Sequence, residues 1–196
     1  MIFETIICTT TSAGTAHLTP LGYTYADEQI LLAPFVPSTT LDNLENNSHA
    51  TLNMVDDVRV FAGCLTGRRD WPLVEAKTHK GWRLKNCLAH KELSVVERVA
   101  DTVRPKFYCD VLFEENHRAF RGYNRAQGAV IEAAILATRL DFLEPAKIKT
   151  EMTYLAIAID KTAGQDEHES WRWIVDLIDA HPSHRGLKQH LNRSRQ

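Results

Sequence analysis

Three consecutive hydroxyl side chains, Ser38-Thr39-Thr40, follow an apolar run that ends at Pro37. The pattern of residues 41–47 predicts a short helix, so the hydroxyls lie at its expected start. Hydroxyls in this place accept hydrogen bonds from the unpaired N–H groups of a first helical turn. Together with those N–H groups they also suit a bound phosphate. The local sequence therefore leaves two interpretations open, an ordinary helix cap and a phosphate-binding turn.

A second group of candidate residues is basic. Arg68-Arg69 precedes Asp70-Trp71-Pro72, and this segment is interpreted either as a solvated loop with an internal ion pair or as a substrate lid. Asn124-Arg125 precedes an alanine-rich helical pattern. An arginine in a first turn opposes the helix dipole, which indicates an anionic partner. A capping asparagine followed by a solvated arginine agrees with the sequence equally well.

Cysteine and histidine show no familiar metal-binding spacing. The four cysteines are far apart, and the nine histidines form no HExxH or similar pattern. Cys64, between two apolar neighbours, is interpreted as a small buried residue rather than a nucleophile. The Gly-x-Ser-x-Gly pattern of many hydrolases is absent. We therefore predict no metal site, and the catalytic residues stay unknown at this point.

The composition is typical of a globular protein, because 44% of the 196 residues are hydrophobic and 24% are charged. A net charge of −2 gives no bulk attraction to nucleic acid. No apolar run approaches the roughly 20 residues of a membrane span, so we expect no membrane partner either. The N-terminus lacks the basic start of a signal peptide, which predicts a cytoplasmic protein with reduced cysteines.

The elements that must position these residues begin with strands. Strand patterns occupy residues 4–10, 16–22, 29–33, 50–55, 93–99 and 107–114. The alternation of apolar and polar residues in the last of them is typical of a half-buried strand. Between the strands we expect the short helix at 41–47, a helical turn capped by Asp56, and an irregular excursion at 66–80.

Helical patterns begin beyond Asn116. We expect helices at 126–140, from Glu144-Pro145 to Ile159, and at 165–180, the first with a face of small residues. The tail that follows is basic, with four cations and no acid, and we expect a frayed, solvated end. It has no aromatic residues for stacking on bases, which argues against a nucleic-acid arm. Strands followed by helices indicate an α+β protein, and the short strands favour an antiparallel barrel.

Several motifs resemble a known family. The strand, the Ser38-Thr39-Thr40 turn and the following helix and strand resemble the FMN-binding split barrels, which include pyridoxamine-phosphate-oxidase-like proteins and flavin reductases. Three longer segments, at residues 57–72, 120–127 and 158–164, resemble one branch more closely. That branch is a domain-of-unknown-function family of FMN-binding split-barrel proteins found in methane-forming archaea and in bacteria that use one-carbon compounds. The resemblance covers residues 1–178.

The resemblance implies an organisation and a set of binding residues. It implies a split-barrel FMN-binding domain at 1–118, a helical segment packed on it at 119–180, and a basic tail at 181–196. It also implies a homodimer with non-covalently bound FMN near the subunit interface. The residues assigned to FMN are Ser38, Thr39, Thr40, Asn43, Asn53, Thr19, Arg121, Asn124 and Arg125.

One departure from the family pattern bears on the phosphate. Oxidase-like relatives often carry a lysine or arginine just after the serine of the turn, where this chain has Thr39, Thr40 and Leu41. The cation is therefore expected from elsewhere, first from Arg121 or Arg125 and next from Arg68 or Arg69. An arginine fork suits a phosphate better than the point charge of a lysine.

The chemistry implied by the resemblance is that of the flavin. Hydride or electron transfer would take place at the isoalloxazine ring, while the protein supplies binding, orientation and electrostatics. We expect a reductase-like oxidoreductase that uses an electron donor and a small-molecule substrate, with a possible place in pterin-type one-carbon metabolism. The alternatives are a non-catalytic flavin carrier, sensor or partner protein, and a haem or pterin binder that uses the same barrel.

Overall fold

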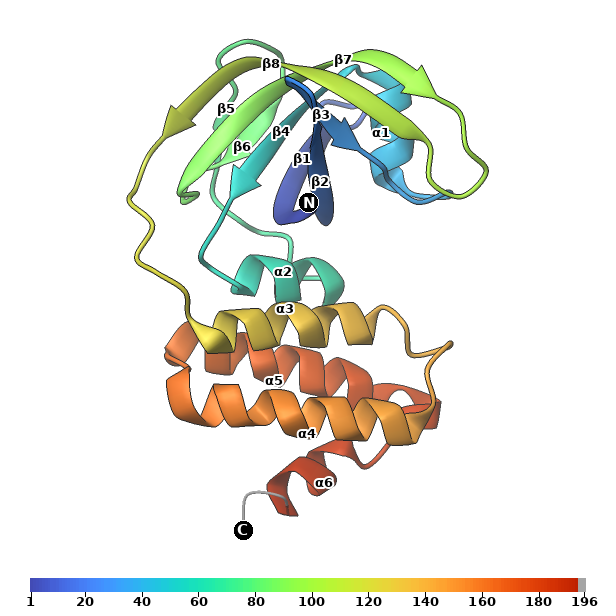
Figure 1. Cartoon of the computed structure of the whole chain (residues 1–196), viewed down its shortest axis with the longest axis vertical. Helices are drawn as coiled ribbons and strands as arrows, with labels where there is room; N and C mark the ends of the chain where they lie inside the picture. Colours follow the sequence, from blue (N-terminus) through green and yellow to red (C-terminus); the bar gives the residue numbers. More distant parts are fainter. Residues whose placement is uncertain (194–196) are drawn as a thin grey trace. The chain divides into compact units, whose positions relative to one another are not determined.

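The computed structural model describes residues 1–193, which form two compact units. Unit 1 contains residues 1–56 and 70–120, and unit 2 contains residues 57–69 together with the described residues from 121 onward. Figure 1 shows the strands of unit 1 and the helices of unit 2. The predicted α+β class, an antiparallel barrel with a C-terminal helical segment, is confirmed.

Unit 1 is a closed antiparallel barrel with strand order β1-β2-β3-β8-β7-β4. The sheet closes because β4 pairs with β1 as well as with β7. All six strand predictions are confirmed, although several strands extend further than expected. Their bounds are β1 Phe3–Thr10, β2 Ala16–Ala26, β3 Gln29–Leu32, β4 His49–Met54, β7 Ala89–Val99 and β8 Lys106–Asn116.

Apolar side chains from the strands fill the barrel. Ile30, Leu32 and Phe107 are almost fully buried, and they come from the paired strands β3 and β8. Helix α1, Thr39–Asn46, adds Leu41 and Leu44 to the same core. This apolar anchoring fixes the helix against the barrel and so fixes the Ser38 turn at its start.

The predicted excursion at 66–80 contains a strand. β5, Leu73–Glu75, pairs with β6, Trp82–Leu84, in a two-stranded sheet of its own. The sheet is tied to β4, because the Thr51 hydroxyl donates to the Trp82 carbonyl at 2.7 Å. Strands of three residues are too short to show a periodic pattern, so this sheet could not be predicted from the sequence.

Unit 2 is helical, and its three predicted long helices are confirmed. They are α3 Arg125–Ala137, α4 Pro145–Thr162 and α5 Gln165–Ala180. The small side chains expected on α3 are buried, among them Ala126, Ala129 and Ala133. Within the described residues, no helix is long and apolar enough to span a bilayer.

A shorter helix, α2 at Arg59–Leu65, also belongs to unit 2. The expected cap by Asp56 is wrong, because the neighbouring Asp57 carboxylate accepts the Arg59 N–H at 3.0 Å. The Arg59 guanidinium also pairs with Asp57 at 2.8 Å and with Asp166 of α5 at 2.9 Å. The start of α2 is therefore held by an arginine between two carboxylates.

The expected frayed tail is wrong for residues 182–193. These residues form a 3-10 turn, Pro182–His184, and helix α6, Leu187–Arg193. Leu187 and Leu191 are buried in the core of unit 2, and apolar burial outweighs the solvation of the basic side chains between them. Arg195, which was assigned to the same tail, lies outside the described residues.

Candidate functional site

The Ser38 turn is a helix cap, as one of the two interpretations predicted. Ser38 is extended, and its hydroxyl accepts the Leu41 N–H at 3.2 Å. The first intrahelical bond runs from the Asp42 N–H to the Ser38 carbonyl at 3.1 Å. The N–H groups of Thr39 and Thr40 precede that bond, so the helix itself offers them no acceptor.

The cap made by Ser38 leaves other hydrogen-bonding groups of this turn available. Thr39 is exposed and Thr40 is buried, and neither hydroxyl makes a hydrogen bond to another described residue. The turn therefore offers two backbone N–H groups and two hydroxyls in consecutive residues. This donor set suits an anion such as a phosphate, and it is compatible with the cap made by Ser38.

Arg104 holds the segment that leads into the turn, a role that no local sequence pattern indicates. Its Nε and Nη2 donate to the Ala33 carbonyl at 2.9 and 2.7 Å, and its guanidinium lies 4.4 Å from the centre of the Phe35 ring. The Val36 N–H also donates to the Val103 carbonyl at 3.0 Å. The connection between β7 and β8 thus positions the approach to α1.

The other candidates of unit 1 make bonds within the barrel. The Asn43 amide donates to the Thr9 hydroxyl at 2.9 Å, and both residues are buried. The Asn53 amide donates to the Ile6 carbonyl at 3.1 Å and accepts the Leu84 N–H at 2.8 Å. Thr19 is half-buried on β2, opposite Ile7 of β1. Asn53 has both ends of its amide engaged, so its contacts are those of a structural residue.

The remaining candidates, Arg121, Asn124 and Arg125, belong to unit 2. Asn124 caps α3, since its Oδ1 accepts the Ala126 N–H at 2.8 Å. Its amide also donates to the Thr162 carbonyl at the end of α4, at 3.0 Å. Arg125 lines a groove of unit 2 together with Lys161. The assignment of these three residues to the phosphate stays a prediction.

The second pair of candidate cations, Arg68 and Arg69, is also in unit 2. The Arg68 guanidinium lies 4.3 Å from the centre of the Trp173 ring. Such stacking is favourable in itself, so this arginine already has an aromatic partner on α5.

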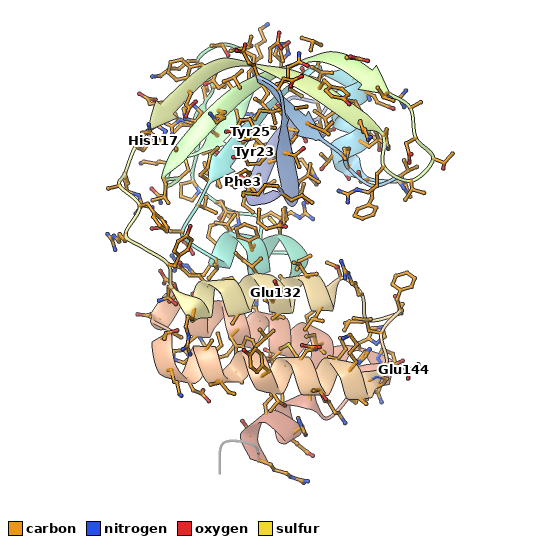
Figure 2. The ribbon with its side chains drawn as sticks, viewed as in Figure 1. Phe3, Tyr23, Tyr25, His117, Glu132 and Glu144 are labelled. Atoms are coloured by element: carbon orange, nitrogen blue, oxygen red, sulfur yellow. The ribbon has the colours of Figure 1, made fainter. Side chains whose placement is uncertain are left out.

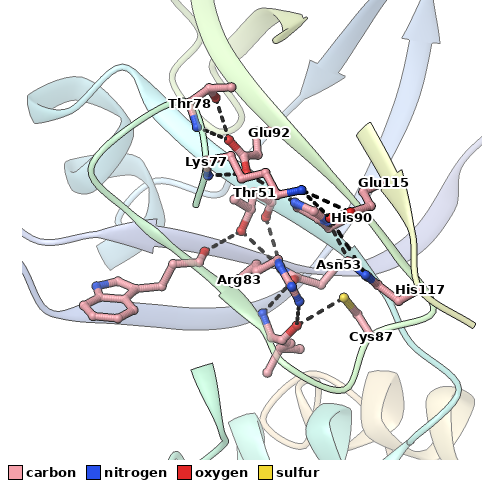
Figure 3. Close-up of polar contacts among 12 residues, drawn as sticks. Thr51, Asn53, Lys77, Thr78, Arg83, Cys87, His90, Glu92, Glu115 and His117 are labelled. Atoms are coloured by element: carbon pink, nitrogen blue, oxygen red, sulfur yellow. Dashed lines mark hydrogen bonds and ion pairs between the residues drawn. The ribbon is translucent and has the colours of Figure 1, made fainter. Parts of the chain in front are cut away.

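Sequence reasoning missed a polar cluster in unit 1 that is built around Glu92 of β7 (Figure 3). The Glu92 side chain is completely buried, and its carboxylate accepts the Lys77 and Thr78 N–H groups, each at 2.7 Å. Burial alone would raise the pKa of Glu92. The hydrogen bonds from Lys77, Thr78 and His90 outweigh burial and lower that pKa to about 2. Glu92 is therefore a buried carboxylate that stays charged.

Two stacked histidines continue the cluster from Glu92. His90 Nε2 lies 3.2 Å from the Glu92 carboxylate, and His90 Nδ1 lies 2.9 Å from His117 Nε2. The two rings are 5.0 Å apart and inclined by 12°. Burial lowers the pKa of both histidines, and the nearby charge of Arg83 lowers both further. Both imidazoles are therefore neutral near pH 7.

Cys87 completes the cluster. One donor atom from each of Cys87, His90 and His117 lies within 4.8 Å of the others. The thiol is buried and donates to the Leu84 carbonyl at 3.1 Å. Burial raises the pKa of Cys87, whereas the Arg83 guanidinium beside it lowers that pKa. The cluster thus joins a thiol and two neutral imidazoles to a buried carboxylate.

Several solved structures share this fold, and one of them contains FMN. An FMN-bound protein from Methanosarcina mazei, described as a DUF447 protein, matches 90% of this chain and 95% of its own, with 19% identity and a TM-score of 0.79. The Pseudomonas fluorescens 2-nitrobenzoate 2-nitroreductase matches 58% of this chain and 64% of its own, with 16% identity and a TM-score of 0.51. Component B of the Bacillus cereus nitrilotriacetate monooxygenase matches 64% and 75%, with 12% identity and a TM-score of 0.51. At these identities the similarity establishes the fold.

Family models extend over most of the chain. Residues 3–118 match the N-terminal domain of the family described as "Protein of unknown function (DUF447)". Residues 124–176 match a second model with the same description. The chain therefore belongs to the DUF447 family.

Proposed function

We propose that this protein binds FMN and acts as a flavin-dependent oxidoreductase of the reductase type on a small molecule. The observation that carries the proposal is the fold. The closed barrel and the helical segment match an FMN-bound member of the same family over 90% of this chain. The family membership and the donor set of the Ser38 turn support the same proposal.

The turn at the start of α1 suits the phosphate of FMN. Thr39 and Thr40 offer N–H groups and hydroxyls without described acceptors, while Ser38 keeps the first helical turn in place. Arg104 holds the approach to this turn through the Ala33 carbonyl. When bound, FMN supplies hydride or electron transfer at its isoalloxazine ring. The chain itself binds and orients the cofactor.

The proposed assembly is a homodimer with the flavin near the subunit interface. Unit 1 carries an aromatic group made by Phe3, Tyr23 and Tyr25, labelled in Figure 2. The Tyr25 residue is 51% exposed and Leu112 of β8 is 45% exposed. Exposed apolar surface of this kind favours association with a second copy. Light scattering at micromolar concentration tests the proposal, and a monomer mass with FMN bound would contradict it.

The substrate is the least constrained part of the proposal. The resemblance points to a small molecule, with a pterin of one-carbon metabolism as the first compound to test. A non-catalytic flavin carrier, sensor or partner protein is the alternative, and the same experiment separates the two. The purified protein is mixed anaerobically with NADH, NADPH or reduced deazaflavin while its flavin absorbance is recorded.

An oxidoreductase should lose its yellow colour with at least one donor and regain it with an acceptor. A protein that stays yellow with every donor supports the carrier alternative. A titration with FMN and with riboflavin tests the binding mode separately. We expect much tighter binding of FMN, because only FMN carries the phosphate that the Ser38 turn is proposed to hold. Equal affinity for the two flavins would remove the phosphate assignment.

A further inference from the structure

The proposed FMN binding assigns no role to the cluster of Cys87, His90 and His117. We propose that these three residues form a site for one divalent transition-metal ion of the zinc type, with a fourth position open to water or another ligand. Thiolate and imidazole are the ligands that zinc prefers in proteins. Three protein ligands with an open position are typical of zinc sites that bind a further ligand.

The backbone brings the three ligands together independently of any ion. Cys87 and His90 are separated by two residues at the start of β7, and β8 ends next to them at Asn116. The His117 N–H donates to the Leu88 carbonyl at 2.7 Å, which fixes the residue beside this loop. Arg118 holds the same loop, because its guanidinium donates to the Asn86 carbonyl at 3.1 Å. The site is therefore preorganised by the β7–β8 pairing.

Glu92 sets the orientation of the first imidazole. Its carboxylate already accepts the Lys77 and Thr78 N–H groups and lies 3.2 Å from His90 Nε2, so we assign the proton of this contact to His90 Nε2. The lone pair of the neutral ring is then on Nδ1, the atom that faces His117. Histidines that bind metals usually donate their other N–H to a carboxylate in this way. The completely buried Glu92 therefore supplies the hydrogen-bond acceptor that orients His90 toward a metal ion.

The second imidazole also has a carboxylate near its other nitrogen, at a longer distance. His117 Nδ1 lies 4.0 Å from the Glu115 carboxylate, and Glu115 also pairs with Lys77 at 3.0 Å. Without an ion, His117 Nε2 donates its proton to His90 Nδ1, because the latter has only a lone pair. With an ion bound, that proton moves to Nδ1, on the side of Glu115. The two histidines can therefore both turn a lone pair toward one point.

The distances require only a small adjustment. Zinc bonds of about 2.0–2.1 Å to nitrogen and about 2.3 Å to sulfur separate tetrahedral ligand atoms by roughly 3.3–3.8 Å. The two imidazole nitrogens are 2.9 Å apart, and all three donor atoms lie within 4.8 Å of one another. His117 follows the end of β8 and its side chain is 18% exposed, so its ring has room to shift.

The charges around the site also allow a cation. Metal binding forms a bond to the Cys87 sulfur and releases the thiol proton to solvent. The Arg83 guanidinium and the Cys87 thiol both donate to the Leu84 carbonyl, each at 3.1 Å, so a positive charge lies close to this sulfur. The carboxylates of Glu92 and Glu115 offset the positive charge of Arg83 and of the ion. The alternative is that the histidines form only a hydrogen-bonded pair, in which case no metal binds.

The test uses untagged full-length protein that has been stripped with a chelator and dialysed. Zn²⁺ affinity is measured by competition with a chromophoric chelator, and Co²⁺ is added as a spectroscopic probe. We expect one ion per chain, a thiolate-to-cobalt charge-transfer band, and the strong visible bands of a four-coordinate site. The absence of stoichiometric binding, or a cobalt spectrum without the thiolate band, would overturn the proposal.

Variants locate the site. Cys87→Ser should abolish the charge-transfer band, and His117→Ala should weaken Zn²⁺ binding about tenfold or more. His117→Ala keeps the test valid if the buried Cys87 does not tolerate change, because His117 is partly exposed. His168→Ala, at an exposed position on α5, is the matched control and should bind like the wild type. Equal affinity of the His117 variant and the wild type would place the metal elsewhere and refute the assignment.

Discussion

Substitution of Asn53 tests whether this residue stabilises the barrel or binds FMN. The resemblance assigns this residue to the cofactor, whereas in the structure its amide joins β1 to β6 within unit 1. The side chain is completely buried and has its carbonyl and its amino group engaged. We therefore predict that Asn53→Ala destabilises the barrel without changing the preference for FMN over riboflavin.

The size of the effect follows from the two bonds that are lost. The Leu84 N–H loses its acceptor at 2.8 Å, and the Ile6 carbonyl loses a donor at 3.1 Å. A buried polar group left without a partner costs about 1–3 kcal/mol. The Leu84 N–H accounts for most of this cost, because the Ile6 carbonyl has a second lone pair. For the two groups together we expect a loss of about 2–4 kcal/mol in the free energy of unfolding.

Urea denaturation followed by circular dichroism measures this loss. With a slope of about 2 kcal/mol per molar urea, the midpoint should fall by roughly 1–2 M. Asn116→Ala, at an exposed position at the end of β8, is the control and should stay within about 0.5 kcal/mol of the wild type. An Asn53→Ala protein with wild-type stability and a selective loss of FMN affinity would refute this reasoning and support a cofactor role.

Three further predictions concern the turn, the arginine and the thiols. The double substitution of Thr39 and Thr40 by alanine, which leaves the Ser38 cap intact, should weaken FMN more than riboflavin, by roughly 1.5–3 kcal/mol for each bond lost to the phosphate, and a parallel loss for both flavins would contradict it. Arg125→Ala should weaken FMN about tenfold, or about 1.4 kcal/mol, and leave riboflavin unchanged; no change for either flavin would make Arg125 a surface residue. Burial raises the pKa of both Cys8 and Cys109 to about 12, so these thiols stay protonated and should not react with a disulfide reagent at pH 8 until the protein is denatured. Fast labelling of either cysteine in the native state, identified by mass spectrometry, would contradict the last prediction.

Much of the fold could be predicted from the sequence, because long apolar patterns dominate it. β1 buries the continuous run from Thr5 to Thr10, and β8 buries Phe107 and Cys109, although Val111 further along is 37% exposed. The helix predicted at 165–180 has the same bounds in the structure. The tail at 187–193 could not be predicted, because two leucines among basic residues give too weak a pattern. Only contact with the core of unit 2 decides that this segment is a helix.

The polar residues were harder to predict, since their partners are distant in sequence. Ser38 was recognised because a cap is a local feature. The Glu92 cluster depends on the pairing of β7 with β8, which brings His117 beside His90 across a separation that no short motif describes. Arg104 likewise acts on Ala33, far away along the chain. A spacing rule cannot find such residues, because the relation between them exists only after the sheet has formed.

The place of α2 in the chain has a consequence for the order of synthesis. This helix precedes β5 in the sequence, yet its buried residue Ala62, and Val58 just before it, belong to the core that α3 and α5 complete. On the ribosome, α2 emerges before the second half of the barrel, and Val58 and Ala62 gain these core partners only when the C-terminal helices follow. A fragment that ends at residue 118 would keep α2 and lose its partners. We therefore expect that the two segments matched by the family models do not fold independently, and that the first alone yields an aggregation-prone barrel with an incompletely covered helix.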